Sequence, residues 1–128
     1  DYAGIGGSGA NKLAVLDPND TMTDPISGVP VMKEIQTVVG PTPDWDFPGV
    51  PTARREWCTN TTVVDPVSGA ALANSADGKL YRWDLASNTL SQSITLTTGL
   101  GEAYTPTMIG PDGTVYAIND ATLFAVGQ

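Results

Sequence analysis

The sequence predicts an all-β fold built from repeated four-stranded antiparallel sheets. One six-residue phrase occurs three times, at residues 12–17, 79–84 and 122–127, and each copy has a Leu in its second position within an alternating pattern. The second and third copies lie 43 residues apart, which is the period of one four-stranded blade of a β-propeller. The turn residues Gly, Pro, Asn and Asp separate most of the apolar runs, as hairpins require. We therefore expect consecutive propeller blades.

Residues 1–39 are expected to form a partial blade. Strands are predicted over residues 2–6, 13–16 and 31–39, because apolar and polar residues alternate there between turn residues. In the last of these segments the spacing of Val31, Ile35 and Val38 also fits a helix. Residues 17–30 contain three prolines and are predicted to be a long loop.

Residues 58–98 are expected to form a complete blade, and residues 99–128 a second partial blade. In the complete blade Tyr81 and Trp83 alternate with Arg82, which predicts packing between blades. The predicted strands of these two blades cover residues 59–64, 70–74, 80–85, 90–96, 105–109, 114–118 and 123–126.

The predicted propeller is incomplete. The chain has ten candidate strands, or about two and a half blades, whereas closed propellers have about four to eight blades. An open arc leaves apolar faces and strand edges in water. We expect other segments or other chains to complete it, as a protein partner or as further copies in a homo- or hetero-oligomer.

Two phrases resemble the repeats of the pyrroloquinoline-quinone-like (PQQ-like) β-propeller family, whose blades carry a "dG-lyawD" signature. They are residues 77–84, Asp-Gly-Lys-Leu-Tyr-Arg-Trp-Asp, and residues 111–117, Pro-Asp-Gly-Thr-Val-Tyr-Ala. The resemblance covers residues 59–128 well and the first third loosely. It implies blade architecture in a family that contains both quinone-dependent dehydrogenases and cofactor-free scaffolds for binding or assembly. The ring of adjacent cysteines in the enzymes needs two Cys, and this chain has one, so we expect no cofactor.

Composition excludes several classes of function. The net charge is -8 at pH 7 and the chain has no His. An acidic surface repels phosphate backbones and anionic lipids, so no nucleic-acid partner is expected, and without a long apolar run no membrane insertion is expected. Ser-His and Cys-His nucleophile pairs are impossible within this chain.

The candidate binding element is the inserted loop over residues 40–57, which contains four prolines and no periodicity. Loops between blades emerge on one face of a propeller, so we expect this loop to share a face with the loop that carries Glu102 and Tyr104. Aromatic side chains can stack on a sugar, a peptide or a neighbouring subunit, and Arg can bind carboxylates. Alternatively, the loop packs its aromatics back onto the blades. The candidate residues are Trp45, Phe47, Arg54, Arg55, Glu56, Trp57, Glu102 and Tyr104.

Two further features allow weaker hypotheses. Asp17, Asn19, Asp20 and Asp24 offer four oxygen ligands for a hard cation, but the spacing is not that of an EF-hand, so a hydrogen-bonded turn is the favoured interpretation and no metal is predicted. Cys58 is the one cysteine; it is either a buried thiol or a disulfide partner for a segment outside the chain.

These observations favour a non-catalytic, secreted or periplasmic β-propeller module for protein-protein binding or structural assembly. An extracellular or periplasmic location suits a chain rich in Thr, Gly and Asp with little Lys. The alternative is part of a larger propeller enzyme, a quinone-dependent oxidoreductase or a hydrolase, with its active site in blades outside this chain.

Overall fold

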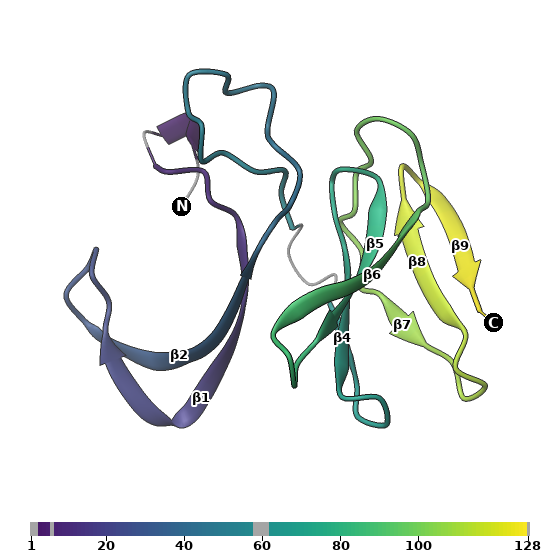
Figure 1. Ribbon diagram of the computed structural model, residues 1–128, viewed down its shortest axis with the longest axis horizontal. Helices are drawn as coiled ribbons and strands as arrows, with labels where there is room; N and C mark the ends of the chain where they lie inside the picture. The colour runs from purple at the N-terminus through teal and green to yellow at the C-terminus, as the bar shows by residue number, and fades with distance from the viewer. Residues whose placement is uncertain (1–2, 6, 58–61, 128) are drawn as a thin grey trace.

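The computed structural model describes residues 3–5, 7–57 and 62–127, and this part of the chain is all-β. Its one helical element is a short 3-10 turn, η1 (Ala3–Ile5). The strands form three antiparallel sheets that follow one another along the chain, and within each sheet the strand order is the sequence order (Figure 1). The strands are β1 (Lys12–Thr23) and β2 (Pro30–Val39) in the first sheet, β3 (Val63–Asp65), β4 (Ala70–Asn74), β5 (Lys79–Asp84) and β6 (Thr89–Thr95) in the second, and β7 (Met108–Ile109), β8 (Val115–Asn119) and β9 (Thr122–Val126) in the third.

The predicted first strand is wrong, and so is the predicted long loop. Within residues 2–6, the structure places the 3-10 turn η1 rather than a strand. The loop expected over residues 17–30 is mostly strand, because β1 continues to Thr23 and β2 begins at Pro30. The ladder tolerates the prolines because Pro18 lies in an irregularity between Asp17 and Thr21, and Pro30 is the first residue of its strand. Cys58 and the first part of the strand predicted over 59–64 lie outside the described residues.

The hairpins β1–β2 and β5–β6 repeat the same pairing. Each runs through four regular pairs and then shifts register, after Val15 and Gln36 in the first hairpin and after Arg82 and Gln92 in the second. In β2 and β6 the shift leaves one extra residue, and such bulges increase the local twist of a strand. The repeated phrase seen in the sequence is therefore a repeated structure.

The hairpins β4–β5 and β8–β9 also repeat one another. Ala71 pairs with Trp83 in the second sheet, and Val115 pairs with Val126 in the third. The equivalent strands are thus β1, β5 and β9, which carry the three copies of the phrase.

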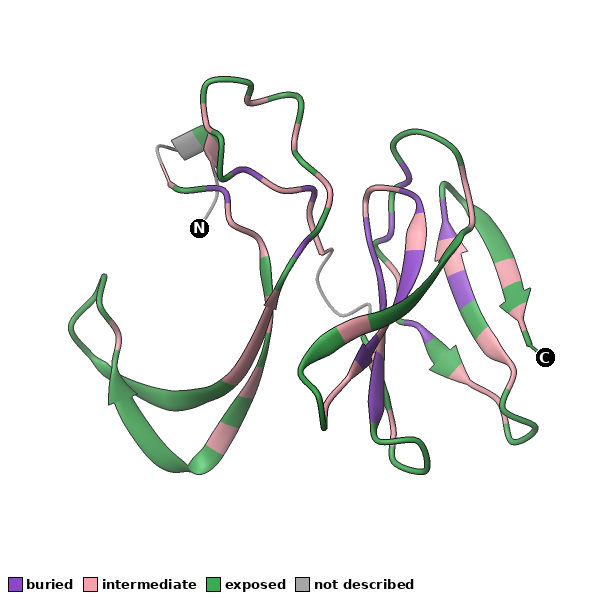
Figure 2. Cartoon of the chain, viewed as in Figure 1, coloured by how far each residue is buried: buried purple, intermediate pink, exposed green. Residues whose placement is uncertain are grey.

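The core lies in the second sheet, as the concentration of buried residues along β4 and β5 shows (Figure 2). Tyr81 and Trp83 are buried as predicted, and they pair with the small residues Ala73 and Ala71. Their face packs toward the segment before β3, where the Trp57 ring meets the Tyr81 ring edge-on at 5.4 Å. Small residues beside aromatic ones let a sheet pack closely against its neighbour.

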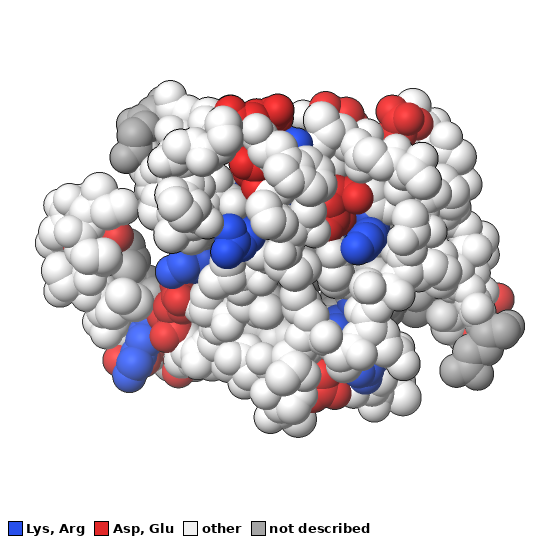
Figure 3. All heavy atoms as spheres, turned by 45° about the horizontal axis from the view of Figure 1, so that its top comes forward, with Lys and Arg blue, Asp and Glu red and all other residues white. Residues whose placement is uncertain are grey.

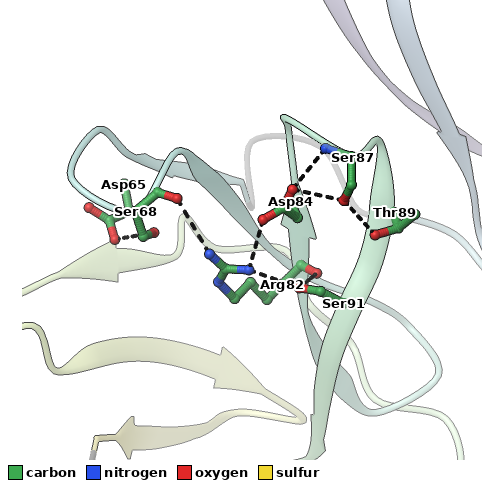
Figure 4. Close-up of polar contacts among 7 residues, drawn as sticks. All are labelled: Asp65, Ser68, Arg82, Asp84, Ser87, Thr89 and Ser91. Carbon is green, nitrogen blue, oxygen red and sulfur yellow. Dashed lines mark hydrogen bonds and ion pairs between the residues drawn. The ribbon is translucent and has the colours of Figure 1, made fainter.

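A polar network holds the outer strand of the second sheet in place (Figure 4). The Arg82 guanidinium on β5 donates to Ser91 Oγ at 2.9 Å and to the Ser68 carbonyl at 3.4 Å. Ser91 is the extra residue at the bulge of β6. Arg82 thus connects the bulge to the β3–β4 turn.

A buried pair of asparagines joins the second sheet to the third. Asn74 and Asn119 are both fully buried. Asn119 Nδ2 donates to Asn74 Oδ1 at 2.9 Å, and Asn74 Nδ2 donates to the Ile118 carbonyl at 2.7 Å. Gly101 lies against this pair, because a Cβ there would come within 1.7 Å of Asn119 Oδ1.

We predict that Asn119→Ala lowers the free energy of unfolding by about 2–3 kcal/mol. The change removes the hydrogen bonds that Asn119 Nδ2 donates to Asn74 Oδ1 and to the Ser75 carbonyl, and losing a hydrogen-bond partner at a buried polar group costs about 1–3 kcal/mol. Urea unfolding measures the effect. Asn19→Ala is the matched control, because the Asn19 side chain is exposed on β1; similar losses in both variants would contradict the prediction.

Candidate functional site

The candidate site lies where the loop over residues 40–57 meets the connection between β6 and β7. Both segments lie at the upper edge of the molecule in Figure 1. They enclose a pocket of about 180 Å³. The pocket is lined by Asp44, Asp46, Phe47, Arg55, Glu56, Ala76, Leu100, Gly101, Glu102 and Tyr104.

Backbone hydrogen bonds hold the loop although it contains no regular strand. The Arg54 amide donates to the Gly9 carbonyl and the Gly40 amide to the Asn11 carbonyl, at 2.9 and 3.0 Å. Across the loop, Arg55 N donates to the Thr42 carbonyl at 2.9 Å. The loop is thereby attached to the segment that leads into β1.

Arg55 organises the interior of the loop. Its side chain is 9% exposed, and Nη1 lies 3.0 Å from Asp44 Oδ1 and 2.8 Å from Asp46 Oδ2. The Trp45 ring lies over the guanidinium, with its centroid 5.2 Å from Cζ. A buried charge is tolerated when it is paired, and an aromatic face adds a cation–π attraction. Trp45 is nevertheless 65% exposed, so the cluster presents its ring to solvent.

Asp77, in the β4–β5 turn, attaches the loop to the second sheet. Its Oδ2 accepts hydrogen bonds from Thr42 Oγ1 at 2.5 Å and from the Tyr81 hydroxyl at 2.6 Å, and its Oδ1 accepts one from Lys79 N at 3.0 Å. Burial, together with the hydrogen bond to Asp77, raises the pKa of Tyr81 well above its usual value. Tyr81 therefore remains a hydrogen-bond donor throughout the physiological pH range.

The structure brings six of the eight candidate residues together. Phe47, Arg55, Glu56, Glu102 and Tyr104 line the pocket, and Trp45 lies beside them over Arg55.

Two candidates take structural positions instead. Arg54 Nη1 donates to the carbonyls of Pro51 and Ala53 within the loop, and Trp57 packs against Tyr81. The alternative that the loop packs its aromatics onto the sheets therefore holds for Trp57 and not for the exposed Trp45.

The sequence-based prediction named two residues of the β6–β7 connection, Glu102 and Tyr104, but not Leu100. Leu100 is exposed and lines the pocket. An isolated large apolar residue between Gly99 and Gly101 is the signal that could have identified it.

The oxygen ligands proposed for a cation serve the β1–β2 hairpin. Asp20 forms an ion pair with Lys33 at 2.7 Å, and this hydrogen bond lowers the pKa of Asp20. Asp24 accepts from the hydroxyl and amide of Ser27 in the hairpin turn, and Asp17 accepts from the amide of Asn19. In the part of the chain that the structure describes, no group of three or more acidic or thiol side chains is placed to hold a metal ion.

The pocket combines acidic and aromatic groups. Glu56 and Glu102 line it together with Phe47 and Tyr104, and Figure 3 shows groups of acidic side chains along the upper part of the molecule in that view. Such a surface favours a ligand that is cationic and partly apolar.

We predict that Arg55→Met lowers the free energy of unfolding by about 3 kcal/mol, because it leaves the buried Asp44 carboxylate without its partner. Chemical denaturation measures the loss. Arg54→Met is the control, since the Arg54 guanidinium donates to the backbone carbonyls of Pro51 and Ala53; an equal loss there would contradict a special role for Arg55.

We predict a pH dependence for Tyr81→Phe. The folded pKa of Tyr81 is raised, so the stability that its hydroxyl contributes is complete below the unfolded pKa near 10 and is lost as the pH rises through the folded value. The variant should be about 1 kcal/mol less stable at neutral pH, and the difference should shrink above about pH 10. Urea unfolding over a pH series measures it, and a difference that stays constant would show that Tyr81 ionises equally in both states.

No protein-family model matches the chain, and the search of curated proteins finds no significant match. Among the described residues, no helix has the length and apolar character needed to cross a membrane.

Proposed function

We propose that the chain is a non-catalytic β-propeller module of the PQQ-like repeat type that acts outside the cytoplasm. It binds a protein partner at the pocket between the loop over residues 40–57 and the β6–β7 connection. The observation that carries the proposal is Trp45, which a buried Arg55 and two aspartates hold at the surface beside a pocket.

The repeated hairpins support the propeller part of the proposal. The β1–β2 and β5–β6 hairpins have equivalent registers and bulges, and β4–β5 matches β8–β9. Sheets that repeat along a chain and are each joined to the next, as the buried Asn74–Asn119 pair joins the second to the third, are what radial repetition requires.

The exposed aromatic residues support binding. Trp45 and Tyr104 are both well exposed, and so is Leu100. Trp and Tyr dominate the energetics of many interfaces. Because the ion pairs of Arg55 already order Trp45, binding at this ring loses little conformational entropy.

The charge of the site favours a basic partner segment. The pocket contains the carboxylates of Glu56 and Glu102, whereas Arg55 is already paired with Asp44 and Asp46. We therefore propose that the partner inserts a Lys or Arg side chain into the pocket and lays an apolar neighbour against Trp45. Screening by salt should weaken such a contact.

This proposal can be tested by selecting binders from a phage-displayed library of random peptides. Peptides enriched on the wild-type protein should contain basic and apolar residues. Their affinity should fall by about 30-fold in Trp45→Ala, which corresponds to about 2 kcal/mol, and it should fall as salt is added. Calorimetry of the selected peptides gives both values.

Val67→Ala is the matched control, because Val67 is an exposed apolar residue in the β3–β4 turn. Selected peptides that bind Trp45→Ala and the wild-type protein equally well would place recognition elsewhere. A Trp45→Ala protein that loses folding stability instead of affinity would make Trp45 a packing residue.

A further inference from the structure

A second pocket, of about 510 Å³, lies between the second and third sheets. Its volume is within the range of small-molecule sites, about 300–1,000 Å³. The second sheet and its β3–β4 turn form one wall, and β8, β9 and the β7–β8 turn form the other. None of its lining residues also lines the pocket beside the loop over residues 40–57. It is therefore a separate candidate site.

Strand pairing places the apolar and the polar lining of the second sheet on one face. Leu80 pairs with Ile94. Leu72 pairs with Arg82, and residues paired across strands share a face of the sheet. Leu80 also pairs with Asn74, whose buried side chain joins the two sheets. Leu80 is 4% exposed and lines the pocket, so the end of the pocket near this junction is apolar and deep.

The wall from the third sheet is apolar. Val115 pairs with Val126, so their side chains share a face, and both residues line the pocket. Every polar or charged residue of the lining therefore belongs to the second sheet and its turns. All four strands of that sheet are described, so the polar wall is complete within the described chain.

Arg82 is the one cation in the lining, and only part of its hydrogen-bonding capacity is used (Figure 4). Nη1 donates to Ser91 Oγ at 2.9 Å and lies 3.4 Å from Asp84 Oδ2, and Nη2 donates to the Ser68 carbonyl at 3.4 Å. A guanidinium has five N–H donors, and none of the residues that the structure describes accepts from Nε. The side chain is 26% exposed. Nε and one Nη2 hydrogen are thus open to a ligand.

The carboxylates near Arg82 are held mainly by serines. Asp84 Oδ1 accepts from the amide and the hydroxyl of Ser87 at 2.9 and 2.8 Å, and these hydrogen bonds, more than Arg82, lower the pKa of Asp84. Asp65 Oδ2 accepts from the Ser68 hydroxyl at 2.5 Å, and this bond is the main cause of the lowered pKa of Asp65. The charge of Arg82 is therefore only loosely neutralised.

We propose that this pocket binds a small ligand with one carboxylate and an apolar body. The carboxylate accepts from Nε and Nη2 of Arg82, because the planar donor fork of Arg matches the two oxygens of a carboxylate. The apolar body lies between Leu80 of the second sheet and Val115 and Val126 of the third. Arg55 offers no such site, since two carboxylates already lie within 3.0 Å of it.

Calorimetry of the full chain tests the proposal with octanoate as the probe. Physiological salt screens the net charge of -8, which opposes the approach of an anion. Octanoate should bind at least about 10-fold more tightly than 1-octanol, which has the same chain without the charge. Propanoate, which has the carboxylate but little apolar body, should also bind about 10-fold or more weakly.

Two variants locate the site. Arg82→Gln should weaken octanoate binding about 10-fold and leave 1-octanol binding unchanged, whereas a general loosening of the second sheet would weaken both. Val115→Trp fills the pocket from the third sheet and should weaken both ligands. Arg54→Gln is the matched control, because it removes a positive charge outside the pocket lining, and it should bind octanoate like the wild-type chain.

Octanoate that fails to bind the wild-type chain, or binds no better than 1-octanol, would overturn the proposal. Unchanged octanoate affinity in Arg82→Gln or Val115→Trp, or an equal loss in Arg54→Gln, would overturn it too. If a variant unfolds, amide chemical shifts of the wild-type chain during the octanoate titration decide. Changes centred on Gln92 and Val115 support the site, and changes centred elsewhere reject it.

Discussion

The turn between β4 and β5 is the constraint on which the rest of the structure depends. The Ala76 amide donates to the Glu56 carbonyl at 3.0 Å, and its carbonyl accepts from Gly101 N at 3.0 Å. The Gly78 carbonyl accepts from Leu96 N and Thr97 N, and a Cβ on Gly78 would come within 2.5 Å of the Thr97 carbonyl oxygen. One tight turn thus joins the long loop, the second sheet and the connection to the third.

Contacts from this turn hold the two segments of the candidate site in place. Asp77 extends the same set of contacts through its side chain, to Thr42 in the loop and to Tyr81 on β5. Each of the two segments that form the pocket walls is bonded to the turn, the loop through the Glu56 carbonyl and the β6–β7 connection through the Gly101 amide. The pocket should therefore keep its shape only while the turn holds both segments, which makes folding of the second sheet a condition for binding.

Local turn chemistry explains which elements were predictable from the sequence. The strand predicted over residues 70–74 has the observed bounds of β4, because Gly69 and the turn at Asp77 limit it on both sides. The first sheet was poorly predicted because its irregular pairing accommodates Pro18, and proline normally signals a loop. The site could be predicted only in part. Loop aromatics are visible in the sequence, but the bond from Thr42 to Asp77 spans 35 residues, and no periodicity reports such a contact.

The repeated phrase also explains why the first and third sheets carry exposed apolar residues. Burying a Leu is worth about 1.5–3 kcal/mol relative to leaving it in water. All three copies of the phrase have a Leu at the second position. Within the described chain, only Leu80 among these three is fully buried. Leu123 is 64% exposed, so this gain is realised at Leu80 in the second sheet and not at the equivalent position of the third.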